Sequence, residues 1–171
     1  MVISVGVCFS SNRNSINYTL TMYQLNQEQI FHAPVEEVWE FISRPENLNT
    51  ITPPELDFEI ISEVPDKMYN GLLIQYKVKL PLLGISDWVT EIKHIIPHRQ
   101  FIDEQRIGPY SFWYHFHGLE KTEEGVKMTD QVSYLPPYGI LGKIANKLLI
   151  RRQLEVIFTH RYEILENRFN T

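Results

Sequence analysis

The chain has 171 residues, of which 43% are hydrophobic and 22% are charged, and these numbers fit one folded domain and exclude a chain that is disordered throughout. Its single cysteine, Cys8, excludes an intramolecular disulfide framework and a cysteine-based zinc module. The formal net charge of −5 argues against nucleic acid or an anionic membrane as the main partner, and no apolar run approaches the ~20 residues of a transmembrane segment.

Residues 1–22 differ in character from the rest of the chain. A short apolar run, Val2–Phe9, precedes a polar stretch, Ser10–Thr19. No Lys or Arg precedes the apolar run, so the pattern of a secretory signal peptide is incomplete. We expect residues 1–22 to be a disordered extension, or the product of a start codon assigned upstream of Met22. The domain is then expected over residues 23–171, in a cytoplasmic protein.

The first part of the domain predicts a strand followed by helices. Tyr23–Phe31 alternates between two faces, as a half-buried strand does. Pro34 suits the first position of a helix, and the apolar residues that follow recur at helical spacing. These residues are Val35, Val38, Trp39 and Ile42. A short helical turn through Leu48 is predicted next, and Pro53 and Pro54 end it.

The middle of the chain predicts a series of strands. The expected strands are Asp57–Glu63, Leu72–Leu80, Ile85–Ile95, Gln100–Gln105, Ser111–Glu120 and Val126–Leu135. Turn signals such as Asn70-Gly71 and Gly108-Pro109 separate them. Pro81–Gly84 is expected to be one such connection. Because the connections are short, neighbouring strands must be antiparallel.

The end of the chain predicts one long helix. Beyond Gly142 there is no Pro or Gly, and the apolar residues follow a helical stripe. About 25 helical residues would span about 40 Å. We therefore predict an α+β fold in which a curved antiparallel sheet wraps around the C-terminal helix and leaves a cavity between them.

Several motifs between residues 23 and 168 carry a family resemblance. They are Phe31–Ile42, Pro45–Leu48 with Ile51–Pro53, Phe101–Gln105 with Gly108–Tyr110, Trp113–His117, Asp130–Tyr134 with Pro136, and the pair Phe158 and Arg161. The sequence resembles the START-like, birch-pollen-allergen-like (SRPBCC) superfamily, in particular its polyketide-cyclase-like, uncharacterised bacterial branch. This resemblance implies the helix-grip fold, with a seven-stranded antiparallel sheet and two short helices after the first strand. It also implies a cavity for lipids, sterols, polyketides or other apolar molecules.

Four polar residues of the predicted strands could carry chemistry. His115 and His117 share one strand face with Trp113, about 6.5–7 Å apart. Asp103 and Asp130 lie in the strands before and after. If these faces all point inward, two histidines and two carboxylates meet in an apolar cavity.

Several interpretations of this group remain open. The carboxylates can orient the histidines in a buried network that anchors a polar head group, or a His–Asp pair can act as a general base. His115 and His117 with a carboxylate can also bind a divalent metal, although the spacing alone is weak. In a fourth interpretation His115 and His117 face solvent, and the aromatic residues between them face the core.

Further residues are predicted to line the cavity. They are Trp39, Tyr76, Trp88, Phe101, Gln105, Trp113, Met128, Val132, Tyr134, Leu154, Phe158 and Arg161. Core packing is an alternative role for each tryptophan. Arg161 either exposes its guanidinium beyond a buried stem or pairs with Asp130 or an anionic ligand group.

Two features near the start of the last helix bear on ligand entry. Pro136–Leu141 is either a gate or a simple connection, and Gly139 and Gly142 would allow hinge motion. Basic residues at near-helical spacing form either a solvated face or a docking face for a membrane or an acidic partner. They are Lys143, Lys147, Arg151 and Arg152.

We therefore expect the protein to bind an apolar small molecule that is lipid, polyketide or isoprenoid-like. One alternative is a cyclase- or dehydratase-type enzyme, with His115 or His117 as the base and Asp103 or Asp130 orienting it. Another is a lipid carrier or chaperone. No cofactor and no metal is expected, and the sequence does not predict an oligomeric state.

Overall fold

The structure of the protein is a computed structural model that describes residues 5–7, 20–80 and 84–171. Most of the predicted N-terminal extension, including Cys8, lies outside these residues, as does most of the Pro81–Gly84 connection. The domain boundary at residue 23 stays a prediction. The described strands extend to the N-terminal side of it, because Val5–Val7 pairs with Leu20–Met22.

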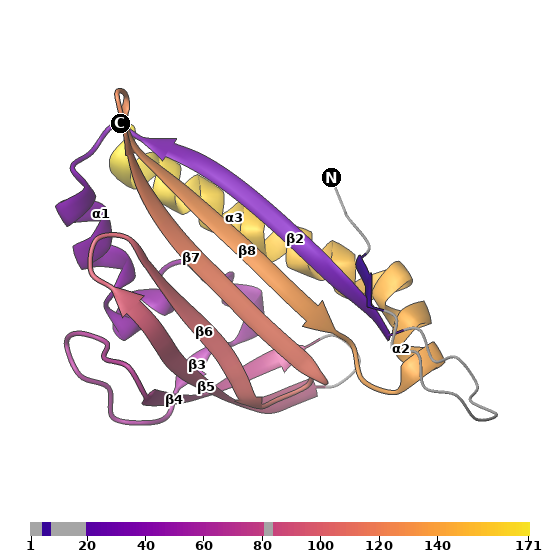
Figure 1. The fold of residues 1–171 in the computed structure, drawn as a ribbon. Helices are drawn as coiled ribbons and strands as arrows, with labels where there is room; N and C mark the ends of the chain where they lie inside the picture. The colour runs from indigo at the N-terminus through magenta and orange to yellow at the C-terminus, as the bar shows by residue number, and fades with distance from the viewer. Residues whose placement is uncertain (1–4, 8–19, 81–83) are drawn as a thin grey trace.

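One curved antiparallel sheet contains all the strands of the described residues (Figure 1). Its spatial order is β1-β2-β8-β7-β6-β5-β4-β3. The bounds are β1 Val5–Val7, β2 Leu20–Phe31, β3 Glu59–Ile60, β4 Leu72–Leu80, β5 Gly84–Ile96, β6 Gln100–Ile107, β7 Phe112–Thr122 and β8 Gly125–Leu135. Strands β2–β8 are the seven predicted from the family resemblance, and β1 adds an eighth at the edge.

Most of the helices lie near their predicted positions, whereas the turn Pro54–Leu56 was not predicted. Helix α1 (Val35–Ile42) and the 3-10 turns η1 (Pro45–Leu48) and η2 (Pro54–Leu56) follow β2. Helix α2 (Gly139–Ala145), the π-helical turn η3 (Asn146–Ile150) and α3 (Arg151–Phe169) are continuous in the chain, and the sheet curves around α3 (Figure 1). The predicted helix-grip fold is confirmed. Within the described residues, no helix combines the length and the apolar character needed to cross a bilayer.

Two element boundaries differ from prediction for physical reasons. The strand expected over Asp57–Glu63 shrinks to Glu59–Ile60, because Asp57 has a left-handed backbone (φ 42°) and only two residues pair with β4. The last helix begins at Gly139 instead of after Gly142. Gly142 therefore lies inside α2, where a Cβ would be 1.9 Å from the Pro137 carbonyl oxygen. The close approach of these two backbone segments requires glycine at this position.

The core lies between the concave face of the sheet and the C-terminal helix. Strand β4 alternates strictly between buried and exposed residues, and β7 and β8 show the same period along most of their length. At the C-terminal end of α3, Phe169 packs against Phe31 of β2 and Phe41 of α1, with ring centroids 5.1 and 5.9 Å apart. Leu165 is one turn earlier on the same helix and is only 1% exposed.

We expect Leu165→Ala to lower the free energy of unfolding by about 2–5 kcal/mol, because it leaves a cavity in this core. Val156→Ala is the matched control on the same helix, since Val156 is exposed, and it should change stability by less than about 0.5 kcal/mol. Urea denaturation followed by circular dichroism measures both variants. Equal effects would show that α3 does not pack on the sheet through this face.

Candidate functional site

A cavity of about 140 Å³ lies between the sheet and α3. Most of its walls are apolar side chains from β4, β5, β7, α3 and the segment after α1, whereas Asp103, His115, His117 and Arg161 form a polar region. Such a combination, with a few polar groups in an apolar enclosure, is typical of small-molecule sites.

Strand register brings the polar residues together. On the concave face, Asp103 of β6 is directly opposite His115 of β7, and Asp130 of β8 is directly opposite His117. Cross-strand neighbours of this kind have Cβ atoms about 4.5–5.5 Å apart. The two imidazoles are consecutive inward residues of β7, and their ring centroids are 3.8 Å apart. The interpretation in which both histidines face solvent is therefore wrong, since each is less than 8% exposed.

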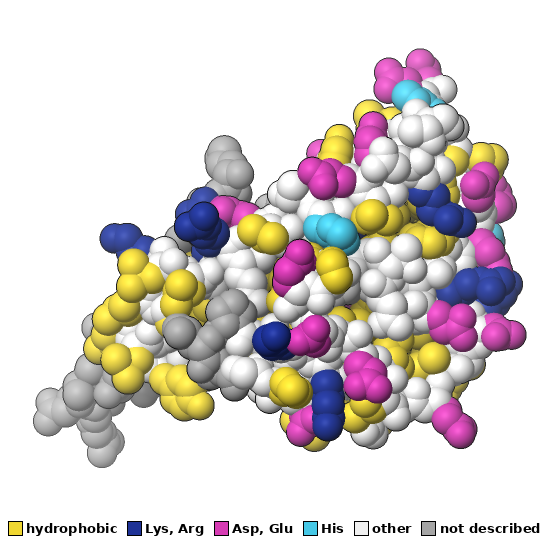
Figure 2. Space-filling model, turned by 180° about the vertical axis from the view of Figure 1, so that it is seen from behind, with side chains coloured by type: hydrophobic (Ala, Val, Ile, Leu, Met, Phe, Trp, Pro, Cys, Tyr) yellow, Lys and Arg dark blue, Asp and Glu magenta, His cyan; other side chains and the backbone are white. Residues whose placement is uncertain are grey.

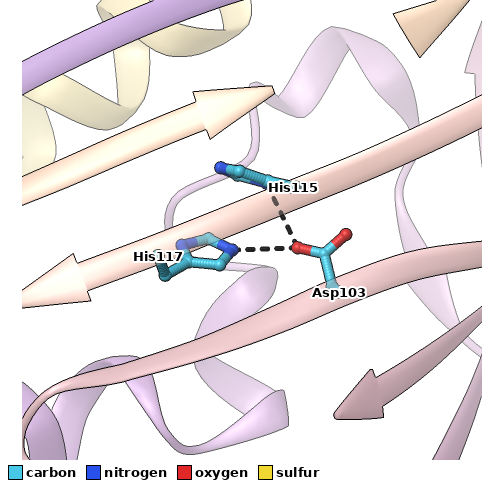
Figure 3. A group of neighbouring side chains, drawn as sticks. All are labelled: Asp103, His115 and His117. Carbon is cyan, nitrogen blue, oxygen red and sulfur yellow. Dashed lines mark hydrogen bonds and ion pairs between the residues drawn. The ribbon is translucent and has the colours of Figure 1, made fainter. Parts of the chain in front are cut away.

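The hydrogen bonds run along the diagonals of this group. His117 Nε2 is 2.9 Å from Asp103 Oδ2, and His115 Nε2 is 2.9 Å from Asp130 Oδ1. The directly opposite atoms are also close: His115 Nδ1 is 3.1 Å from Asp103 Oδ2, as Figure 3 shows. His117 Nδ1 is 2.9 Å from Asp130 Oδ1 but makes no hydrogen bond. Every ring nitrogen of the pair thus faces a carboxylate.

Neighbouring aromatic residues hold this arrangement in place. Trp113 Nε1 donates a hydrogen bond to Asp103 Oδ1 over 3.2 Å, which leaves Oδ2 directed at the histidines. Phe101 stacks on the His117 ring with centroids 4.1 Å apart, and Phe158 of α3 lies 5.5 Å from the His115 ring. These contacts restrict the rotation of both imidazoles.

The electrostatics of the group favour charged side chains. Burial alone would raise the pKa of Asp103 and Asp130, but the charges and hydrogen bonds of the two histidines outweigh it and hold both pKa values well below the ordinary 3.8. Burial alone would likewise lower the pKa of His115. The adjacent carboxylates outweigh that effect, and the net result is a pKa above the ordinary 6.5. The group therefore binds a proton on His115 more tightly than an exposed histidine would.

Arg161 adds a second buried cation beside the carboxylates. It lies on α3, is 9% exposed, and its Nη1 is 3.7 Å from Asp130 Oδ1. The interpretation with an exposed guanidinium is wrong, and the predicted proximity to Asp130 is confirmed. However, Nε and Nη1 make no hydrogen bond with any described residue. Since buried donors are normally satisfied, this arginine has hydrogen-bonding capacity to spare at the wall of the cavity.

The same residues could also hold a metal. One ligand atom each from Asp103, His115 and His117 lies within 4.8 Å of the others. Two imidazole nitrogens and a carboxylate oxygen are an acceptable ligand set for a divalent transition metal. Yet two carboxylates and one guanidinium leave a formal charge of −1, which a single proton on the histidine pair already neutralises. The charge balance thus favours protonation over a divalent ion.

The structure places most of the predicted lining residues at the cavity. Those at its wall are Tyr76, Trp88, Phe101, Trp113, Met128, Leu154, Phe158 and Arg161, together with Asp103, His115 and His117. Asp130 lies behind the histidines and does not line the cavity.

Four predicted lining residues lie elsewhere for identifiable reasons. Trp39 packs against Phe101 from α1, and Val132 is fully buried in the sheet face. The side-chain amide of Gln105 donates a hydrogen bond from Nε2 to the Tyr110 carbonyl oxygen and accepts one at Oε1 from the Tyr110 backbone N–H. Tyr134 lines a groove on the other side of α2, and its hydroxyl donates to Asn146 Oδ1.

Sequence reasoning missed other wall residues. Tyr110 follows the Gly108-Pro109 turn and Gln153 interrupts the apolar stripe of the helix, and both line the cavity. Gln153 Nε2 makes no hydrogen bond with a described residue. A polar residue within an apolar helical stripe is a signal that could have identified it. Thr90 was missed as well, and it bonds Tyr76 and Trp88.

Comparisons with known proteins support the fold. No protein-family model matches the sequence, and no curated protein matches it. An uncharacterised protein from Rhizobium leguminosarum is similar in structure, with 20% identity, a TM-score of 0.60, and coverage of 85% of this chain and 95% of its own. The protein TTHA0849 from Thermus thermophilus has 15% identity, a TM-score of 0.58 and coverage of 85% and 98%.

A third similar structure is Ara h 8.0201, of the birch-pollen-allergen-like type. It is 13% identical, with a TM-score of 0.54 and coverage of 85% of this chain and 99% of its own. The predicted likeness to the START-like, birch-pollen-allergen-like superfamily is thus confirmed at the level of the fold. Identity this low carries no activity or ligand from one protein to another.

The raised pKa of His115 predicts a pH dependence of stability. The native state holds this proton more tightly than the unfolded chain, so its contribution is fully present below pH 6.5 and is lost as the pH rises through the raised pKa. His115→Gln should flatten the decline of the unfolding free energy above pH 6.5. Urea titrations at a series of pH values measure this slope.

The exposed histidine His32 supplies the control. His32→Gln should retain the wild-type slope, since this residue lies outside the carboxylate group. An unchanged slope in His115→Gln would contradict the assignment of a stabilising proton to His115. The two carboxylates act in the opposite sense, because their lowered pKa values stabilise the fold above pH 3.8 and this contribution is lost on acidification.

Proposed function

We propose that the protein binds a small apolar molecule whose polar end is a hydrogen-bond acceptor, such as a carboxylate or a carbonyl. The observation that carries this proposal is the buried Arg161 guanidinium at the wall of an apolar cavity, of which Nε and Nη1 make no hydrogen bond with a described residue. Burying a donor without a partner costs about 1–3 kcal/mol, so a ligand that supplies an acceptor recovers that loss.

Thr90 and Asp103, two other polar residues at the cavity, already have hydrogen-bond partners. Thr90 Oγ1 is 3.0 Å from Trp88 Nε1 and 3.1 Å from the Tyr76 hydroxyl. Asp103 accepts from Trp113 and His117. Apart from His117 Nδ1, which faces Asp130, the buried polar atoms at this cavity that make no hydrogen bond with a described residue belong to Arg161 and Gln153. This distribution supports a ligand with one acceptor end and an apolar remainder.

The dimensions support an elongated ligand. The cavity of about 140 Å³ alone is small for a lipid-like molecule. A second pocket of about 200 Å³ opens beside it under α2, and Leu80, Tyr110 and Gln153 line both. An apolar chain could therefore extend from Arg161 past these three residues into the outer pocket. This path agrees with the predicted gate at Pro136–Leu141, of which Pro137, Tyr138 and Leu141 line the outer pocket.

Two alternatives stay predictions. A buried His–Asp pair also suits proton transfer, as a cyclase or dehydratase would require, but the geometry on its own assigns no reaction. The second alternative is a carrier or chaperone that delivers the same ligand to another site. In that case the ligand would leave through the outer pocket.

Filling the cavity should abolish binding. Ile157 lines the inner cavity, so Ile157→Trp places a large side chain where the ligand would lie. We expect loss of octanoate binding, followed by the intrinsic fluorescence of Trp88 and Trp113 at the cavity wall. Val156→Trp adds the same group at an exposed neighbouring position and should bind like wild type. Normal binding by Ile157→Trp would exclude the inner cavity as the site.

Removing the guanidinium should alter discrimination between head groups. Wild type is expected to bind octanoate more tightly than 1-octanol, because a charge-assisted hydrogen bond contributes about 1.5–3 kcal/mol. Arg161→Met should weaken octanoate binding by about tenfold or more and bring the two affinities together. Arg152→Met makes the same change at an exposed site of α3 and should preserve the preference. If Arg161→Met weakened the binding of octanoate and of 1-octanol equally, Arg161 would have a structural role only and would not recognise the head group.

A further inference from the structure

The outer surface of α2 and η3 carries an unusual concentration of exposed apolar side chains. Between residues 138 and 149, six large hydrophobic residues are exposed by 41% to 78%. They are Tyr138, Ile140, Leu141, Ile144, Leu148 and Leu149, and we call them the α2 patch. Figure 2 shows hydrophobic side chains gathered at this end of the molecule, with Lys and Arg side chains beside them. A contiguous exposed apolar patch of this kind marks an interaction surface.

The charged side chains within the segment that carries the α2 patch are all positive. Lys143, Lys147, Arg151 and Arg152 are exposed on the same segment, and no Asp or Glu occurs between residues 136 and 154. Arg151 pairs with Glu155. Lys143, Lys147 and Arg152 have no ion-pair partner within the described ranges. A chain with a net charge of −5 thus concentrates free cations on its most apolar exposed segment.

The α2 patch also surrounds the way into the ligand path. Tyr138, Leu141 and Leu149 belong to the patch and at the same time line the outer pocket. A surface that bound to the α2 patch would therefore lie directly against the opening of that pocket.

We propose that the α2 patch docks onto the surface of a lipid bilayer that contains anionic lipids. Exposed apolar side chains next to Lys and Arg are the pattern of helices that lie in the membrane interface, with the apolar groups among the lipids and the cations at the head groups. Tyr138, the most exposed member, has a side chain suited to this boundary. Each Lys or Arg near an anionic membrane surface adds to the attraction.

The charge distribution favours a membrane over a second copy of this chain. A symmetric dimer through the α2 patch would bring the four cations of one copy against the same four of the other, which is unfavourable. The negative net charge of the whole chain argues against binding to anionic membranes, but it does not determine how this one face interacts with them. Screening limits electrostatic attraction to about 10 Å, so the local cations dominate at a docked face.

Vesicle co-sedimentation of the full chain tests this proposal. Wild type should sediment with vesicles of phosphatidylcholine and phosphatidylserine, and markedly less with phosphatidylcholine alone. Lys143→Glu/Lys147→Glu should lower the partition coefficient on the anionic vesicles by at least about tenfold. Ile140→Asn/Leu148→Asn removes apolar contact without changing charge and should reduce binding to both kinds of vesicle.

Lys67→Glu/Lys121→Glu is the matched control. It changes the net charge by the same amount, but Lys67 pairs with Glu40 of α1 and Lys121 is next to the β7–β8 turn, which lies at the opposite end of the molecule from α2 (Figure 1). This variant should sediment like wild type. Circular dichroism checks whether each variant is folded.

Three results would overturn the proposal: no sedimentation of wild type, equal sedimentation of the Lys143/Lys147 variant, or equal loss in the control. A fourth result that would overturn it comes from light scattering without vesicles. If the wild type is a dimer and Ile140→Asn/Leu148→Asn is a monomer, the α2 patch is a protein interface. The inference does not rest on the proposed ligand, because the vesicle assay needs none. Failure here leaves the octanoate measurements unaffected.

Discussion

Two carboxylates on the concave face of the sheet, those of Asp103 and Asp130, impose the central constraint on this molecule. Asp130 is almost fully buried and Asp103 is largely so, and a buried charge is unfavourable unless cations and hydrogen bonds compensate for it. Two imidazoles and one guanidinium provide that compensation. The register of β6, β7 and β8 and the position of α3 are what bring these groups together. Any shift of one residue in register would move the polar groups to the opposite face of the sheet.

The C-terminal helix links this polar centre to the surface. Its α3 segment carries Arg161 at the cavity and Gln153 at the junction with the outer pocket, while α2 and η3 carry most of the exposed α2 patch. Gly142 allows the backbone of α2 to lie against Pro137, and Asn146 in the π-helical turn accepts a hydrogen bond from Tyr134. One continuous element therefore provides polar recognition, a path for an apolar chain and the surface around its opening.

The arrangement also explains how the site can be polar without being open to water. Asp130 lies behind the histidines, whereas Arg161 is at the cavity wall with two donor atoms, Nε and Nη1, that make no hydrogen bond with a described residue. Apolar walls surround those donors, so an acceptor that reaches them is largely shielded from solvent, where hydrogen bonds to charged groups are strongest.

The sequence by itself determined the class of fold, the order of the elements and the residues that could carry chemistry, because alternation, helical periodicity and turn residues are local signals. It left open which face of β7 points inward, since Phe112, Tyr114 and Phe116 make an equally good core face. Only the tertiary structure decided that His115 and His117 are buried, because the choice depends on the partners that β6, β8 and α3 supply. For the same reason Gln105 and Tyr134 lie outside the cavity and Gln153 lies at it: the sequence pattern places a residue on a face, whereas strand bulges, turns and helix packing decide what that face meets.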